Sequence, residues 1–434
     1  MAMRIKFSRK IGTSENIKAL LLEIGSSFEP FILLDSNSTH TNDYSKLYKS
    51  KFELLSAFGC VTYINSQTKG AFERLKAYYN NTNDWLFGHL GYSLHEDTEN
   101  IQSTFNSAER FPAMYFFQPL YVVYVANNVL HVEYIPELSD NAVINRLKNI
   151  EIPINVNNEK GEQIKVCSKI DKPKYIDKIL AIKQHIAIGN LYETNYCIEF
   201  YNDNIVIDPY SVYNRLTSVA PTPFSAFYKN NNSYLLCSSP ERYISNTGGL
   251  LVSQPIKGTL SSALSKDILR NNKKEVAENI MVTDLVRNDL SHIAEKGTVN
   301  VDELCGIYTF SRVHQMISTI SCRLRADVHP IDALRHTFPM GSMTGAPKIR
   351  AIQICNELEP STRGIYSGSV GYFTPEGDFD FNVVIRSIVY NKLKKYLSFH
   401  VGSAITAGSI PETEYDECLL KAEAMLYALN ATIC

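Results

Sequence analysis

Two pairs of glutamates are spaced so that they could bind a metal ion. Glu275 and Glu278 are three residues apart in KKEVAENIMVTDLVRNDL, and Glu414 and Glu417 repeat this spacing in PETEYDECLLKA. Both segments are predicted to be helical, so each pair would lie on one face of its helix. Two such faces brought together would form an oxygen-rich site that suits Mg²⁺. The alternative is solvated helix surface, where glutamate is common.

Two basic residues lie among apolar or small neighbours, where a charged side chain needs a partner or a chemical role. Lys257 lies in QPIKGTL, and a partly desolvated lysine beside a cation site has a lowered pKa and can act as a nucleophile. The alternative is a loop lysine that points to water. Arg386 lies in FNVVIRSIVY, which we predict to be a strand. It needs an anionic partner, either a ligand carboxylate or a structural Asp or Glu.

A loop rich in Gly, Ser, Thr and Pro, FPMGSMTGAPK at 338–348, opens a predicted helix. Its backbone N–H groups could hold an anion at the helix N-terminus. The alternative is an ordinary strand-to-helix turn.

The surrounding pattern predicts the elements that must position these residues. Residues 120–135 indicate a hairpin with a type I′ turn at Asn127-Asn128, and Pro173 and Gly189 bound an amphipathic helix. Further strands are expected at 234–245, 250–254, 368–373, 379–390 and 396–401, and further helices at about 265–288, 330–337, 346–358 and 411–430. Strands that pair through hairpins, with helices between sheet segments, indicate the α+β fold class.

The composition excludes several classes of protein. Of 434 residues, 44% are hydrophobic and 20% charged, so wholesale disorder is excluded. The net charge of −2 gives no reason to expect a nucleic-acid or membrane partner, and no apolar run reaches the roughly 18 residues of a membrane span. The nine cysteines form no C-x-x-C motif and are expected to be buried thiols. With no secretory signal, this predicts a cytoplasmic protein.

Five motifs, in order along the chain, resemble those of the chorismate-utilising enzymes. They are S-P-E-R at 239–242, P-I-K-G-T at 255–259, E-N-I-M-V-T-D-L-V-R-N-D at 278–289, G-S-M-T-G-A-P-K at 341–348 and I-R-S at 385–387. A weaker resemblance covers PFILLDS at 30–36 and GHLGYSL at 88–94. The resemblance implies a large antiparallel β-sandwich with helices packed outside. It also implies an anthranilate synthase component I-like region at 1–165 and a chorismate-binding catalytic domain at 170–430.

Lys257 indicates which branch of that family the chain resembles. The aminodeoxychorismate synthase branch carries this lysine in P-I-K-G-T, whereas anthranilate synthases carry alanine there. The resemblance therefore implies Mg²⁺-dependent amination of chorismate at C4, in the para-aminobenzoate branch of folate biosynthesis. Two alternatives stay open: the large subunit of an anthranilate synthase, and a non-catalytic chorismate-binding paralogue.

The resemblance also implies roles for individual residues. Lys257, in neutral form, would attack C2 of the chorismate ring, and Glu241 would be the general acid–base group, protonated through burial. Glu278 and Glu417 would coordinate Mg²⁺, while Glu275 and Glu414 hold its waters and Lys421 balances their charge. Arg386 and Tyr372, together with backbone N–H groups around Gly402, would bind the enolpyruvyl carboxylate. Ser342 and Thr259 would make further contacts with the substrate.

Three positions depart from the family pattern. Gln315 stands where the family often has histidine, so we expect a hydrogen-bonding contact there and not a proton carrier, with His314 facing away. Glu193 stands where glutamine is usual, and it could hold ammonium or an attacking water, or pair with a basic residue. Ala404 replaces the last glycine of a G-A-G motif and would narrow the pocket.

The source of ammonia is expected to be a separate chain. The sequence has no G-x-C-x-G context for a glutaminase thiol, so the resemblance implies a glutamine amidotransferase subunit as partner. Asp35-Ser36 stands where tryptophan-sensitive relatives carry Glu-Ser, which leaves open whether tryptophan binds the N-terminal region.

Overall fold

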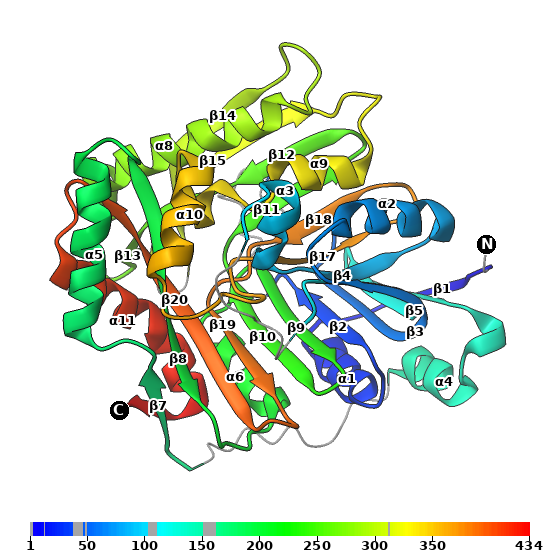
Figure 1. Cartoon of the computed structure of the whole chain (residues 1–434). Helices are drawn as coiled ribbons and strands as arrows, with labels where there is room; N and C mark the ends of the chain where they lie inside the picture. Colours follow the sequence, from blue (N-terminus) through cyan, green and yellow to red (C-terminus); the bar gives the residue numbers. More distant parts are fainter. Residues whose placement is uncertain are drawn as a thin grey trace.

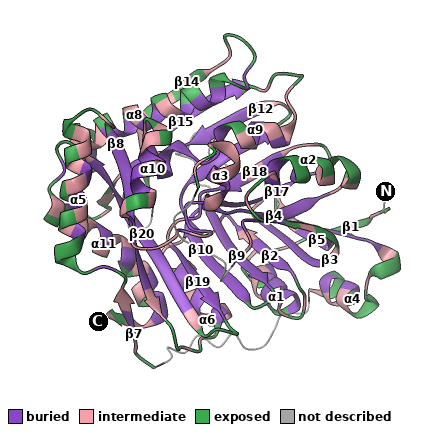
Figure 2. Ribbon diagram, in the orientation of Figure 1, coloured by how far each residue is buried: buried purple, intermediate pink, exposed green. Residues whose placement is uncertain are grey.

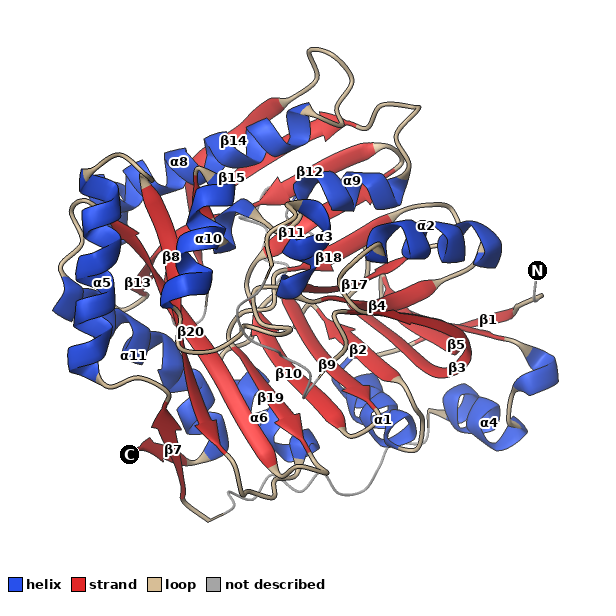
Figure 3. Ribbon diagram, viewed as in Figure 1, coloured by secondary structure: helices blue, strands red, loops and turns tan. Residues whose placement is uncertain are grey.

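The computed structural model describes residues 3–12, 14–37, 47, 50–102, 111–150, 162–310 and 313–434. Its strands join into one large sheet in which nearly all neighbours are antiparallel. This sheet folds over on itself into two layers, with helices on the outer faces (Figure 1, Figure 3). The predicted α+β class and the sandwich with outer helices are confirmed.

Two 13-residue strands carry the sheet from one layer into the other. They are β3 (Leu54–Ser66) and β5 (Met114–Ala126), which pair along their whole length. The first half of β3 pairs with β2 (Phe31–Asp35) in the first layer, whereas the first half of β5 pairs with β4 (Leu86–Leu90) in the second. A register shift between Cys60 and Thr62 marks the bend.

Each layer continues away from this bend by hairpins and longer crossings. From β2, the first layer runs through β9 (Phe224–Asn230), β10 (Ser233–Ser239), β19 (Ser387–Asn391), β20 (Tyr396–Thr406), β8 (Glu193–Asn202) and β7 (Ile164–Ser168). From β4, the second layer runs through β17 (Ser369–Phe373), β18 (Phe379–Asn382), β11 (Arg242–Thr247), β12 (Leu250–Gln254) and β15 (Val313–Arg323), which pairs with β13 (Ile256–Ser261) and β14 (Asn300–Thr309). Short additions are β6 (Val129–Tyr134) with β1 (Ile5–Lys10), β16 (Gly345–Ala346) on β8, and β21 (Ala431–Ile433), parallel to β7.

Buried apolar residues lie between the layers and between each layer and its helices. Figure 2 shows that most residues of the central strands are buried. The outer face of the first layer is covered by α1 (Ser14–Ser26), α4 (Asn141–Asn149), α5 (Lys172–Ala187), α6 (Pro209–Val219) and α11 (Pro411–Leu429). The second layer is covered by α2 (Ala71–Thr82), α8 (Lys273–Ser291) and α9 (Pro330–Thr337). The remaining helices are α3 (His95–Thr98), α7 (Lys266–Arg270) and α10 (Lys348–Leu358), which contacts β8.

Several local predictions are confirmed and three are wrong. One is the single strand predicted at 234–245, which is two strands because β10 ends at Ser239 and β11 begins at Arg242. Asn127 and Asn128 both have positive φ, as a type I′ turn requires, and α5 ends two residues before Gly189. Residues 379–390 do not form one strand: β18 ends at Asn382, and Arg386, with φ of 50°, lies in the break before β19. The helix predicted at 265–288 is two helices, because Asn272 caps the N-terminus of α8.

The expectation of nine free thiols is also wrong. Cys167 on β7 and Cys434, directly after β21, form a disulfide with their Cα atoms 5.0 Å apart. They are 267 residues apart in sequence and meet only because β21 lies beside β7. Spacing along the chain carries no sign of such a pair.

The predicted division of the chain between residues 165 and 170 stays a prediction. Strands from both sides of it share one sheet, since β2 pairs with β9 and β4 pairs with β17. Residues 151–161, which precede the boundary between the two predicted regions, lie outside the described residues. Among the described helices, none is both long and apolar enough to cross a membrane.

Candidate active site

The two predicted glutamate pairs meet where α8 and α11 approach the sheet. Lys274 Nζ lies 2.8 Å from Glu414 Oε1 on α11 and 3.7 Å from Glu278 Oε1 on its own helix. Burial and the nearby Glu417 carboxylate raise the pKa of Glu275, which shows that the helices bring these two acids within electrostatic reach. The prediction that all four glutamates gather in one place is therefore consistent with the structure.

The chemistry of this cluster fits a divalent cation. Glu278 Oε1 and Glu414 Oε2 are buried and accept no hydrogen bond from the described residues, which is costly for a carboxylate unless a cation satisfies it. In the described conformation, no three acidic, histidine or cysteine side chains yet converge as metal ligands. Lysine side chains hold the carboxylates instead, including Lys421, whose Nζ lies 2.6 Å from Glu417 Oε1.

Lys257 lies buried on β13 beside these acids. Its Nζ donates a hydrogen bond to Glu193 Oε1 at 2.7 Å, with only 9% and 5% of the two side chains exposed. Burial alone would lower the pKa of Lys257, but the Glu193, Glu278 and Glu241 carboxylates outweigh burial and raise it. The surrounding carboxylates thus favour the protonated lysine, in contrast to the neutral amine that attack on a ring requires.

Gly258 explains how β13 comes so close to α8. Its φ of 99° lies in a region that favours glycine, and a Cβ at this position would lie 3.1 Å from Glu275 Oε2. A larger residue here would therefore strain the backbone and crowd the Glu275 carboxylate.

Glu241 lies in the two-residue break between β10 and β11. It is buried, hydrogen bonds with Ser342 and senses the charge of Lys257. Burial raises the pKa of Glu241 to about 7, so a large part of this carboxyl group is protonated at neutral pH. This agrees with the predicted acid–base group and also brings Ser342 into the site.

Arg386 and Gly402 offer anion-binding groups. The Arg386 side chain has no carboxylate partner among the described residues, and burial lowers its pKa. Gly402 on β20 lies opposite Cys197 on β8, whose N–H donates to Glu359, while the Gly402 carbonyl accepts a hydrogen bond from Lys421. The two residues therefore form a non-hydrogen-bonded pair, and the Gly402 N–H points away from β8.

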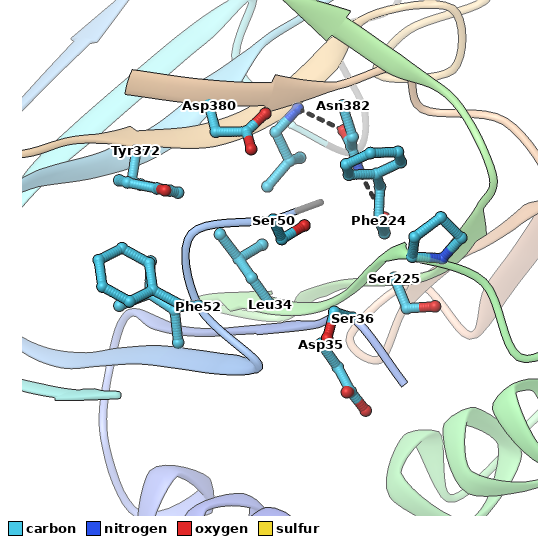
Figure 4. A pocket seen from close by; sticks show the side chains of 13 residues that line it. Leu34, Asp35, Ser36, Ser50, Phe52, Phe224, Ser225, Tyr372, Asp380 and Asn382 are labelled. Carbon is cyan, nitrogen blue, oxygen red and sulfur yellow. Dashed lines mark hydrogen bonds between the residues drawn. The ribbon is translucent and has the colours of Figure 1, made fainter. Parts of the chain in front are cut away.

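Tyr372 does not lie with these groups. Its ring packs between the layers against Phe52, Trp85 and Phe87, and it lines a separate pocket (Figure 4). Its position argues against the predicted contact with the enolpyruvyl carboxylate. The alternation of β17 accounts for this, since Val370 and Tyr372 share the face that lines this pocket.

Tyr366, six residues earlier, was missed by the sequence analysis. Its hydroxyl lies 3.9 Å from Cys197 Sγ, and Cys197 on β8 is the strand partner of Gly402 on β20. The signal in the sequence is the first tyrosine of GIYSGSVGYF, just before the strand begins.

The separate pocket holds the Asp35-Ser36 pair. The Asp35 carboxylate is held by Lys18 at 2.7 Å, and the Asp380 carboxylate is held by Arg242 at 2.9 Å. The carboxylates of Asp35 and Asp380 are therefore already neutralised by side chains of the chain itself.

The other predicted contacts lie on β13 and β15. Gln315 is buried opposite Thr259, and its Oε1 accepts no hydrogen bond from the described residues, which fits a contact that awaits a donor. His314 hydrogen bonds with Thr309 and the Leu264 carbonyl, so it faces away from Gln315 as predicted. Thr259 itself is exposed, and its contact with substrate stays a prediction.

Arg363 is a second residue that the sequence analysis missed. Its buried guanidinium forms an ion pair with Glu359 at 2.6 Å and donates hydrogen bonds of 2.7 Å to the carbonyls of Met343 and Asn195. It thereby joins the loop that carries Ser342 to strand β8, which carries Glu193. Nothing in the local sequence distinguishes it from a surface arginine.

Comparison with known proteins identifies the family. The profile of the chorismate binding enzymes matches residues 29–427. The chain belongs to this family. It is 36% identical over 257 residues to aminodeoxychorismate synthase component 1 of Bacillus subtilis. The matched region covers 57% of this chain and 54% of that protein. It is 34% identical over 285 residues to anthranilate synthase component 1 of Acetivibrio thermocellus. The matched region covers 63% of this chain and 56% of that protein.

A solved structure shows the same fold. Anthranilate synthase component I from Streptococcus pneumoniae superposes with a TM-score of 0.75 at 23% identity, covering 89% of this chain and 94% of that one. The chain spans only 28 to 59% of the length of the curated aminodeoxychorismate synthases that it matches.

Proposed function

We propose that this chain aminates chorismate at C4, giving 4-amino-4-deoxychorismate, with Mg²⁺ and with ammonia from a glutamine amidotransferase partner. The observation that carries the proposal is Lys257, an amine buried among carboxylates at a position where anthranilate synthases carry alanine. A curated relative named aminodeoxychorismate synthase component 1 supports both the reaction and a partner subunit.

The groups of the site fit the parts of this substrate. Chorismate carries two carboxylates and a hydroxyl at C4, which is a poor leaving group. The Arg386 guanidinium, which has no carboxylate partner among the described residues, and the Gly402 N–H, which points away from β8, would bind the enolpyruvyl carboxylate. Glu278 and Glu417, supported by Glu275 and Glu414, would hold Mg²⁺, which supplies positive charge at the ring carboxylate.

Lys257 and Glu241 would then share the chemistry. The lysine amine forms a bond to C2 while the ring double bonds shift and the C4–O bond breaks. Glu241 gives its proton to the departing hydroxide, which leaves as water. Ammonia forms a bond to C4, the double bonds shift back and the lysine leaves C2. Covalent catalysis of this kind divides one difficult substitution into two easier steps.

Anthranilate synthesis is the second candidate function. The similarity to anthranilate synthase component 1 of Acetivibrio thermocellus favours it, at 34% identity over 285 residues. Lys257 argues against it, because a lysine side chain at this position fills the space from which ammonia would attack C2. A non-catalytic paralogue would need neither a buried lysine nor an acid with a raised pKa.

Product analysis of the purified chain with chorismate, Mg²⁺ and ammonium tests the proposal. We expect aminodeoxychorismate in the mass spectrum and no growth of anthranilate fluorescence. Anthranilate as the main product would overturn the proposal.

We propose the cytoplasm as the location, since seven of the nine cysteines are free thiols.

A further inference from the structure

The tightest contact of Lys257 is its ion pair with Glu193. The Nζ–Oε1 distance is 2.7 Å, and the two side chains are almost fully buried. Glu193 is the first residue of β8, where its backbone pairs with Thr406 of β20 and Ala346 of β16. The carboxylate is therefore fixed on a rigid part of the sheet and can exchange a proton with Lys257 directly.

Lys257 cannot act as a nucleophile while it holds this proton, because an ammonium group has no free electron pair. The charged groups that face it come from several elements: Glu193 on β8, Glu241 before β11, Glu275 and Glu278 on α8, and Glu417 and Lys421 on α11. The acids among them favour the cation, so the proton must pass to a specific acceptor within the site.

Only one of these acids receives the hydrogen bond of the ammonium group and has no other task in the proposed reaction. Glu241 hydrogen bonds with Ser342 and serves the leaving hydroxide. Glu275, Glu278 and Glu417 belong to the cation cluster. Glu193 is left, and it is in direct contact with the proton.

We propose that Glu193 takes the proton from Lys257 before the lysine attacks C2 and takes part again when the lysine leaves; this inference rests on the proposed function. Substrate that displaces water from the site would favour the transfer, because desolvation disfavours an ion pair relative to the neutral amine and acid. The tight hydrogen bond then becomes the path of the proton.

The proton balance of the cycle closes. Glu193 Oε1 takes one proton from the Lys257 ammonium group, and the neutral amine attacks C2 and becomes a secondary ammonium. Glu241 gives its proton to the hydroxide that leaves C4 as water. Ammonia attacks C4, the N–C2 bond breaks with its electron pair on the lysine nitrogen, and the new C4 ammonium returns one proton to Glu241. Glu193 finally returns its proton to Lys257.

The variant Glu193→Gln separates proton transfer from positioning. A glutamine carbonyl can still accept the hydrogen bond from Lys257, but it cannot take the proton. With chorismate, Mg²⁺ and a constant concentration of free ammonia, we expect kcat to fall about 100-fold or more, the usual contribution of a general base, while KM for chorismate changes little. Glu193→Asp should restore part of the rate.

Glu199→Gln is the matched control. Glu199 is a buried glutamate on the same strand, bonded to the Tyr396 hydroxyl at 3.0 Å and remote from the contacts of Lys257. Its variant should keep kcat close to that of the wild type. A Glu193→Gln enzyme that keeps the wild-type kcat would overturn the inference, because Glu193 would then only position the lysine.

A second measurement needs no turnover. Lys257 is labelled with an amine-reactive reagent across a pH series without chorismate, and the labelled peptide is quantified by mass spectrometry. In Glu193→Gln, half-maximal labelling should move to lower pH, because the nearest negative charge is lost. An unchanged labelling curve would show that the ion pair does not exist, and the inference would fail.

The two proposals fail in different ways. If the proposed function is wrong, the wild type makes no aminodeoxychorismate in the same assay, and the inference falls with it. If only the inference is wrong, the wild type makes this product and Glu193→Gln makes it at the same rate.

Discussion

Surroundings, not residue type, give the glutamates of this site different properties. Burial raises the pKa of Glu241 and of Glu278 to about 7. Burial would also raise the pKa of Glu417, but the Lys421 ammonium outweighs it and lowers this pKa below its ordinary value. One site therefore contains both a carboxyl group that can donate a proton at neutral pH and a carboxylate that stays ionised.

The pKa of Glu241 predicts a pH dependence of the reaction. The protonated form must serve the leaving hydroxide, and it is lost as the pH rises through about 7. With free ammonia held constant, kcat/KM for chorismate should therefore fall above about pH 7 and not below it. Steady-state rates between pH 6 and 9 measure this, and a rate that rises with pH through that range would exclude Glu241 as the acid.

The ion pair of Lys257 shows which part of the residue chemistry the sequence could predict. The motif P-I-K-G-T indicated a catalytic role for Lys257, and the spacing of the glutamates indicated a cation-binding cluster. The partner of Lys257 lies 64 residues away on another strand, so the choice among the alternatives for Glu193 had to come from the structure.

At the scale of elements, the cation cluster depends on the approach of α8 to α11. Lys274 bridges the helices now, and its contacts with Glu414 and Glu278 occupy carboxylates that would face a metal ion. The periodicity of each helix was predictable, because residues three apart share a face. Their approach was not, because it depends on the packing of both helices against the folded sheet.

Removing one carboxylate should weaken binding of Mg²⁺. Glu278→Gln keeps the shape of a buried side chain but removes its charge, and we expect a clear loss of Mg²⁺ affinity by calorimetry and of turnover at limiting Mg²⁺. Asp284→Asn, on the same helix and paired with Arg287 at the surface, is the control and should change neither. Unchanged Mg²⁺ affinity in Glu278→Gln would remove this residue from the cation site.

Arg363 should be important for stability because it joins two elements that carry site residues. Arg363→Met leaves the buried Glu359 carboxylate without its partner, so the free energy of unfolding should fall by about 3–5 kcal/mol. Arg335→Met breaks an exposed ion pair with Glu73 and should cost about 1 kcal/mol or less. Urea denaturation measures both, and equal losses would show that Arg363 is not a structural link.

Backbone breaks were the main limit on predicting the elements. The α5 helix and the Asn127-Asn128 hairpin follow from local residue types, and both are confirmed. Arg386 was placed within a strand because its neighbours are apolar, but its positive φ interrupts the sheet. Tyr372 was predicted in the site, whereas its side of β17 lines a separate pocket, which only the pairing of the whole sheet determines.

At the scale of the whole molecule, one sheet collects the site from distant segments. Its residues lie between Glu193 and Lys421, on strands of both layers and on two outer helices. The α+β class could be predicted from hairpins and helices, and the sandwich from the family resemblance. The fold of the sheet across β3 and β5 could not, because it depends on pairings such as β4 with β17, which are far apart in sequence.

The proposed source of ammonia predicts a property of the isolated chain. Within the given sequence no G-x-C-x-G motif offers a glutaminase thiol. Glutamine alone should therefore give no aminodeoxychorismate, whereas ammonium at alkaline pH should, and an added amidotransferase subunit should restore the use of glutamine. Glutamine-dependent turnover by the pure chain would contradict this expectation.

The central claim is that Lys257 becomes covalently bound to the ring during amination at C4. Its most direct test is the mass of the Lys257 peptide after incubation with chorismate and Mg²⁺ without ammonia. The account predicts an adduct equal to chorismate less one water on Lys257, absent from Lys257→Ala. If Lys257→Arg, whose guanidinium stays protonated and cannot attack, forms aminodeoxychorismate at the wild-type rate and the wild type carries no adduct, the account is contradicted.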